Sequence, residues 1–182
     1  MLQLNLDKYY NHSLFYNKNH EMMSKDWKNR HYGIFEIILL DIPEIINLNK
    51  QIKYIPKKEK EYKFDNVVCD GQVIKFNAMS VHRIYIIGLC EYGTISENIT
   101  IGNDVEEFNY TFIMKTFHTN SFQGLDNNEK NKKCRLIKQY WGNDNQKHNI
   151  YSYNICLEKN LNLNKIILPI NLSVHILGII LI

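Results

Sequence analysis

The chain has 182 residues, of which 45% are hydrophobic and 12% are aromatic, with 8 Gly and 3 Pro. This composition excludes a disordered or collagen-like chain, and the length suits one domain with a full hydrophobic core. The formal net charge of +3 at pH 7 is too small to indicate a nucleic-acid partner. Ala78 is the only alanine, whereas β-branched and aromatic residues are abundant, which favours strands over helices.

Apolar runs separated by polar turns recur along the chain and predict about nine antiparallel strands. We therefore expect a single domain over residues 1–182, an all-β sandwich of two antiparallel sheets, with residues 1–30 as a weakly patterned wrapping arm. The last run is apolar on both faces and predicts a central strand. In chain order the runs are Gly33–Leu40, Gln51–Ile55, Lys63–Val68, Gln72–Phe76, Val81–Leu89, Ile95–Ile101, Val105–Met114, His148–Leu157, Leu163–Leu168 and Val174–Leu181.

Turn residues lie between several of these runs. Asp70-Gly71 predicts a hairpin, because Gly accepts a positive φ angle and Asp tolerates one. Gly102-Asn103-Asp104 predicts a second turn, and the strand after it alternates apolar and polar residues, as a half-buried strand does. Residues 120–133 are polar and read as a loop.

Neither end of the chain predicts export or a membrane span. The first nineteen residues lack the apolar core of a signal peptide, and the apolar run 165–182 is interrupted by Pro169 and polar residues. We expect a cytoplasmic protein that does not enter a membrane, and an extracellular one if the start is incomplete. The cysteines are far apart in a chain of this size and are expected to be buried free thiols: Cys69, Cys90, Cys134 and Cys156.

Several of these features resemble one family. The segment Asp65–Ile74, the run Arg83–Gly88 and the ending Leu168-Pro169 followed by Val174-His175-Ile176 look like the galactose-binding-like jelly-roll modules found beside bacterial glycoside hydrolases. The resemblance covers roughly residues 60–182 and implies a jelly-roll β-sandwich that binds carbohydrate, with a glycoside hydrolase as a partner. The chain departs from the family pattern at Gly102-Asn103-Asp104, where many members have Asp-Gly-Thr.

Catalytic motifs are missing from the sequence. There is no Gly-x-Ser-x-Gly nucleophile turn, no glycine-rich phosphate loop and no His-x-His or His-Glu-x-x-His metal signature. Glu106 and Glu107 are adjacent on a strand and would point to opposite faces. We therefore expect a protein that is not an enzyme. A small hydrolase whose His–carboxylate pair assembles only in space is the least favoured alternative.

The segment Gln139–Asn145 combines aromatic, amide and carboxylate side chains around Gly142 and reads as a loop. A sugar presents an apolar C–H face and a ring of hydroxyls, so its binding site needs an aromatic platform and planar hydrogen-bonding groups. We expect a neutral sugar to bind here. The candidate ligand-binding residues are Tyr140, Trp141, Asn143 and Asp144, together with Tyr92 beside Gly93.

Trp141 has an alternative role that stays open. Trp141 can instead be a lid on the core, which would make the domain a structural or protein-interaction sandwich with no sugar site. We expect no cofactor. The oxygen-rich run 126–129 could bind a structural calcium ion, although its spacing favours a solvated turn.

Overall fold

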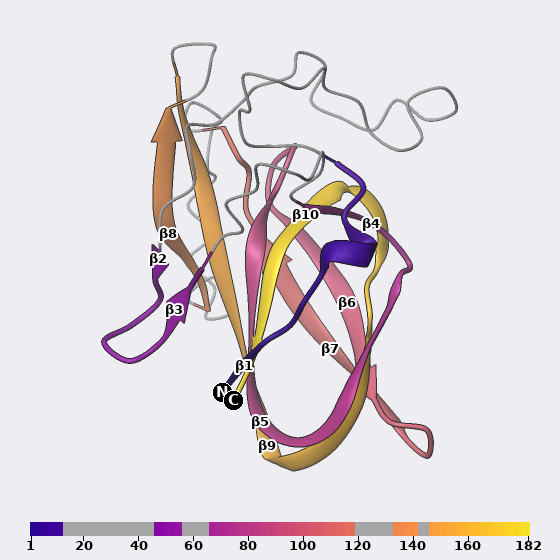
Figure 1. The fold of residues 1–182 in the computed structure, drawn as a ribbon. Helices are drawn as coiled ribbons and strands as arrows, with labels where there is room; N and C mark the ends of the chain where they lie inside the picture. Colours follow the sequence, from indigo (N-terminus) through magenta and orange to yellow (C-terminus); the bar gives the residue numbers. More distant parts are fainter. Residues whose placement is uncertain (13–45, 56–65, 119–132, 142–145) are drawn as a thin grey trace.

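The computed structural model describes residues 1–12, 46–55, 66–118, 133–141 and 146–182 (Figure 1). Within these residues the protein is all-β, and the helical structure is a 3₁₀ turn, η1. The expected strand Gly33–Leu40, the residues 13–30 of the expected arm and the run 126–129 lie outside the described residues. The elements are β1 (Leu2–Gln3), η1 (Asp7–Tyr9), β2 (Ile46–Asn47), β3 (Lys53–Tyr54), β4 (Val67–Asp70), β5 (Val73–Cys90), β6 (Ile95–Gly102), β7 (Glu107–Met114), β8 (Cys134–Trp141), β9 (Lys147–Ile167) and β10 (Ile170–Leu181).

One large antiparallel sheet contains most of these strands. Its order is β1-β10-β5-β9-β6-β7, with β4 also paired to β10 and β8 also paired to β9. A small second sheet consists of β2 and β3. The expected all-β antiparallel class is confirmed, and the arrangement is β-sandwich-like.

Two strands are much longer than the sequence indicates. The expected strands Gln72–Phe76 and Val81–Leu89 are parts of one strand, β5, and two further expected strands are parts of β9. The pairing of β5 with β9 shifts register between Lys75 and Met79 and again between Val81 and Arg83. At these shifts both strands bend together, as Figure 1 shows at the lower end of the molecule. The polar residues at the bend look like a turn in the sequence, but the strands continue through it.

The bend folds the large sheet back on itself and creates the main core. The first half of β5 and the second half of β9 lie with β6 and β7, while their other halves lie with β8 and β10. Side chains from both layers are fully buried between them, among them Ile74, Ile84, Phe112 and Ile166. Burying each such side chain contributes roughly 1.5–3 kcal/mol, so this core is the largest stabilising feature of the fold.

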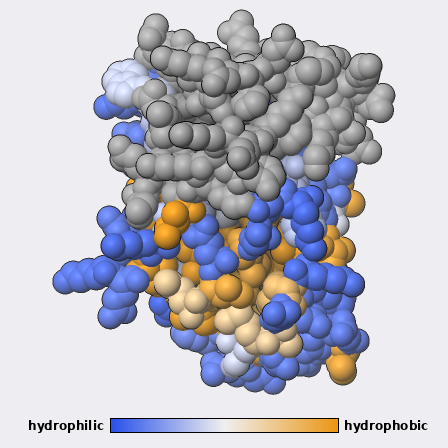
Figure 2. Space-filling model, in the orientation of Figure 1, coloured by the Kyte–Doolittle hydropathy of each residue, from blue (hydrophilic) through white to orange (hydrophobic). Residues whose placement is uncertain are grey.

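A second core lies on the opposite face of the layer that contains β8 and β10. Alternation along β5 sends Ile84 and Ile86 into the main core and Tyr85 and Ile87 into the second one. The side chains of β10 are distributed between the two cores in the same way, which confirms the expected central strand with two buried faces. In the coloured part of Figure 2, hydrophilic atoms lie along the sides and the lower rim of one face, and hydrophobic atoms lie between them.

The turn at Asp70-Gly71 is present, with Gly71 at a φ of 72°, but it does not close the expected hairpin. Strand β4 pairs with β10 on one side of the turn, and β5 continues away to pair with β9. The expectation of a hairpin was wrong because an Asp-Gly pair indicates only the φ angles of the turn, whereas the partner of each strand depends on the whole sheet. The turn at Asn103 does close a hairpin, and Asn103 Oδ1 accepts hydrogen bonds from the backbone of Val105 and Glu106.

Strand β8 corrects the expected loop, because Gln139–Trp141 belong to a strand. The pairing of β8 with β9 shifts register between Leu136 and Lys138. Before this shift Leu136 lies opposite Tyr151 of the main core, and after it Lys138 lies opposite Ile150 of the second core. The bulge reverses which residues face inward, so the sequence shows no continuous alternation across it.

The β2–β3 hairpin and the N-terminal residues attach to the C-terminal strand. The Tyr54 hydroxyl donates a hydrogen bond of 2.7 Å to the Leu177 carbonyl oxygen, and Gln3 exchanges two hydrogen bonds with the backbone of Ile55. The Tyr54 ring lies against the backbone at Gly178, where a Cβ atom would overlap ring carbon Cε2. A glycine at position 178 therefore makes room for the ring that covers the second core.

Gly178→Ala should lower the free energy of unfolding by about 1–3 kcal/mol, because the new methyl group displaces the Tyr54 ring. Urea denaturation followed by circular dichroism measures this change. The Gly178→Ala/Tyr54→Ala double variant is the control, since removal of the ring removes the overlap and should make the two effects non-additive. Additive effects in this cycle would contradict the assigned contact.

Candidate functional site

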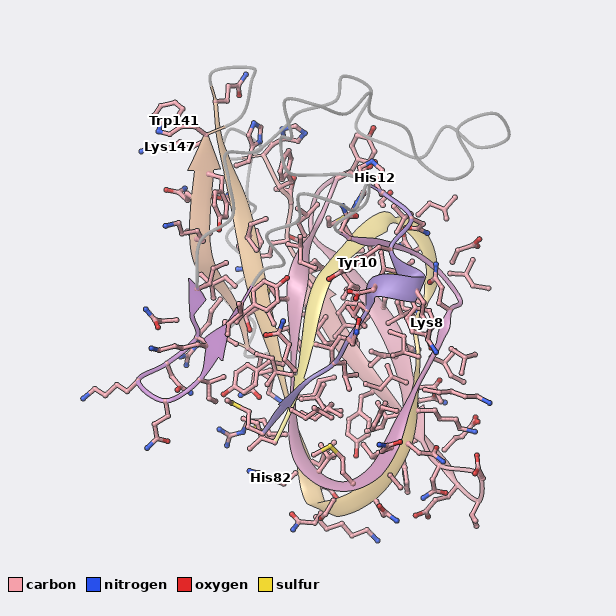
Figure 3. The ribbon with its side chains drawn as sticks, in the orientation of Figure 1. Lys8, Tyr10, His12, His82, Trp141 and Lys147 are labelled. Carbon is pink, nitrogen blue, oxygen red and sulfur yellow. The ribbon has the colours of Figure 1, made fainter. Side chains whose placement is uncertain are left out.

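Trp141 ends β8 and lies opposite Lys147, which begins β9. Its side chain is 54% exposed, and the Lys147 ammonium lies over the indole ring at 5.1 Å from the ring centroid. Figure 3 shows the two side chains together at the end of β8. The structure thus presents one large aromatic ring to solvent beside a positive charge.

Tyr140 lies on the other side of the same strand. Its side chain is only 4% exposed and packs in the second core with Ile46 and Tyr54. Adjacent residues of a strand point to opposite faces, so the two aromatic side chains do not form one platform. Of the expected pair, Trp141 alone is available to a ligand.

Two amide side chains lie beside Trp141 on its face of the sheet. Gln139 lies opposite Asn149, and Trp141 lies opposite Lys147. The two residues on each strand are two positions apart, so all four belong to one face of the sheet. The Gln139 Nε2 group donates a hydrogen bond of 2.9 Å to Asn149 Oδ1. Asn149 was not identified from the sequence. In a hairpin, residues equally far from the connection face each other, so a pairing of Trp141 with Lys147 also pairs Gln139 with Asn149.

The other expected ligand residues are not gathered at Trp141. Asn143 and Asp144 lie outside the described residues, in the connection from β8 to β9. Tyr92, 54% exposed, follows the end of β5. Residues 116–118 pair with Cys90 on one side and with β9 on the other, so three inter-strand spacings, about 14 Å, separate this turn from β8.

A second polar cluster is buried where β4, β10 and the N-terminal residues meet. His175 Nε2 lies 2.9 Å from Glu91 Oε1, and His175 Nδ1 lies 3.0 Å from Asn66 Oδ1. Asn66 Nδ2 in turn donates to the His12 carbonyl oxygen at 3.1 Å and lies 3.3 Å from His12 Nδ1. His175 and Asn66 are fully buried, and Glu91 is 5% exposed.

This cluster contains the His–carboxylate pair that a hydrolase would need, but its polar atoms are already in use. Both ring nitrogens of His175 face oxygen acceptors, so neither is left to activate a nucleophile. The contacts join residues up to 109 positions apart in the chain. The arrangement therefore fastens His12 and the segment before it to the sheet.

Among the described residues, no group of three or more His, Cys, Asp or Glu side chains is arranged to hold a metal ion. The four cysteines are free thiols, as expected, but Cys156 is exposed rather than buried. Burial raises the pKa of the Cys90 and Cys134 thiols to about 11, which makes them poor nucleophiles.

Comparison with known proteins gives no family for this chain. No family profile matches the sequence, and no curated protein is significantly similar to it. In the described part of the chain, no helix has the length and apolar character needed to cross a membrane.

The buried cluster should make stability depend on pH through His12. The pKa of His12 falls from 6.5 to about 3, mainly because burial disfavours the charged imidazolium and also because His175 repels it, while the Asn66 hydrogen bond acts in the opposite direction. The unfolded chain therefore binds this proton at a higher pH than the folded chain does. The stabilisation is complete above pH 6.5 and is lost as the pH falls toward 3.

The free energy of unfolding should fall by about 1–2 kcal/mol more between pH 6.5 and 5 in the parent protein than in His12→Gln. Urea titrations at several pH values measure the difference. His82→Gln is the matched control, because His82 is exposed at the opposite end of the molecule (Figure 3) and should leave the slope unchanged. Equal slopes in the parent protein and His12→Gln would contradict the assignment.

Proposed function

We propose that this protein is a non-catalytic carbohydrate-binding module that recognises its ligand at Trp141. The observation that carries the proposal is the half-exposed indole next to the hydrogen-bonded Gln139–Asn149 amide pair. An indole ring packs against the apolar C–H face of a sugar, and planar amides exchange paired hydrogen bonds with neighbouring hydroxyls. Trp141 and Gln139 lie on one face of β8, two residues apart, whereas Asn149 on β9 is only 4% exposed and serves to orient the Gln139 amide.

The rigidity of the site supports this function. Gln139 and Trp141 belong to a strand that is paired along its length with β9, so their backbone positions are set before a ligand arrives. The Gln139–Asn149 hydrogen bond orients both amides as well. A preorganised site loses less conformational entropy on binding, which matters for sugars because each of their hydrogen bonds replaces one to water.

The finer fold assignment is part of the proposal: a jelly roll of the galactose-binding-like type, with a glycoside hydrolase as its partner and the cytoplasm as its location. The resemblance in the sequence supports it, and several of the quoted motifs occupy structural turns and strand ends. Gly71 has a positive φ, Pro169 lies between β9 and β10, and His175 is a buried residue of β10.

A structural or protein-interaction domain is the second candidate, and one observation favours it. Strand β8 pairs with β9 alone among the described strands, so its other edge has no described partner strand. Leu136 on this strand is 51% exposed. An edge strand with an exposed apolar residue is a common place for another protein to add a strand.

Trp141→Ala should weaken carbohydrate binding by about tenfold or more, because the stacking surface is lost. Isothermal titration calorimetry against galactosides, xylosides, fucosides and galacturonides measures the affinity. Tyr92→Ala removes an equally exposed ring on a turn that lies three inter-strand spacings from β8, and is the matched control, expected to bind as the parent protein does. If the folded parent protein binds none of the sugars in the panel, the result would contradict the proposed function and favour the interaction domain.

A further inference from the structure

We infer that the sugar bound at Trp141 carries a carboxylate, so that the ligand is a uronate-containing glycan rather than a neutral one. This inference rests on the proposed function and names its ligand class. The expectation of a neutral sugar agreed with the small net charge of the whole chain. The charges beside the site decide which ligand is attracted, because charges farther away than about 8–10 Å are screened in physiological salt.

Lys147 is the residue that distinguishes the two ligand classes. Its ammonium lies 5.1 Å from the centroid of the Trp141 ring, within the range of a cation–π interaction. A sugar that stacks on this ring must share or displace that ammonium. A neutral sugar offers only hydroxyl groups in return, whereas a carboxylate on the sugar gives the ammonium an ionic hydrogen bond at the edge of the ring.

The other basic residues of this region do not act at the ring. Lys138 lies on the opposite face of β8, with Tyr140, and Lys133 and Arg135 are six to eight residues from Trp141, about 20 Å or more along the strand. The acidic turn of the β6–β7 hairpin, with Asp104 and Glu106, belongs to the part of the sheet that pairs with the second half of β9. Lys147 therefore determines the charge beside the Trp141 ring in the described part of the chain, although the chain as a whole is nearly neutral.

The amide pair suits the same ligand. The Gln139 Nε2 group has two N–H donors and uses one of them toward Asn149 Oδ1. Lys147 and Gln139 lie on neighbouring strands and one pair apart, so the diagonal separation of their Cα atoms is about 7–8 Å. A sugar ring with its carboxylate toward Lys147 can place a hydroxyl oxygen near the second Gln139 N–H. In this arrangement the indole contacts the sugar ring, Lys147 binds the carboxylate and Gln139 binds a hydroxyl group of the uronate.

The test compares oligogalacturonate with its fully methyl-esterified form, which has the same sugar rings and linkages but no charge. Calorimetric titrations of the full chain should give about five- to tenfold tighter binding of the acid than of the ester, with an affinity that falls as salt is added. Lys147→Gln should reduce the affinity for the acid to that for the ester, and Lys147→Arg should retain most of the difference. Lys159→Gln, which removes an exposed lysine at the bend of β9, should change neither affinity.

The same comparison with oligoglucuronate and its ester covers a second uronate. Equal binding of acid and ester, with loss of both in Trp141→Ala, would overturn the inference and leave the proposed carbohydrate binding intact. Preference for the acid that persists in Lys147→Gln would also overturn it, because the charge would then act elsewhere. Failure of every acid, ester and neutral sugar to bind the folded parent protein would overturn both proposals.

Discussion

The continuity of β5 and β9 through their shared bend is the constraint on which the rest of the structure depends. The two strands remain hydrogen-bonded to each other on both sides of the bend, so the two layers are parts of a single sheet. No loop has to be ordered to bring the layers together, and apolar side chains on the inside of the bend form the main core. Strands β6, β8 and β10 each pair with β5 or β9, β1 and β4 pair with β10, and β7 pairs with β6, whereas β2 and β3 form the small second sheet.

Attachment of the N-terminal residues to these strands buries polar groups, which then need hydrogen-bond partners inside the protein. His12, Asn66, Glu91 and His175 come from four separate segments and meet where the N-terminal residues cross β4 and β10. Burying a polar group without a partner costs several times what a neutral hydrogen bond contributes, so such a cluster is stable only when its members satisfy one another. The cluster thus ties the assembly of the N-terminal residues to that of the sheet.

Strand alternation decides which chemistry reaches the surface. The bulge in β8 reverses the direction of its side chains, so Tyr140 is buried in the second core and Trp141 is exposed beside Lys147, Gln139 and Asn149. A shift of one residue would bury the indole and expose the phenol. The candidate sugar site and the second core are therefore two consequences of one local irregularity.

The sequence by itself determined the features that depend on neighbouring residues: the all-β class, the β6–β7 hairpin, the turn glycine Gly71 and the two buried faces of β10. These follow from φ preferences and apolar alternation over a few residues. Only the tertiary structure decided that β5 and β9 run unbroken, that β8 is a strand, and that Glu91 meets His175 and Gln139 meets Asn149. Each of these depends on a partner strand, which sets register and bulges through contacts that no short stretch of sequence contains.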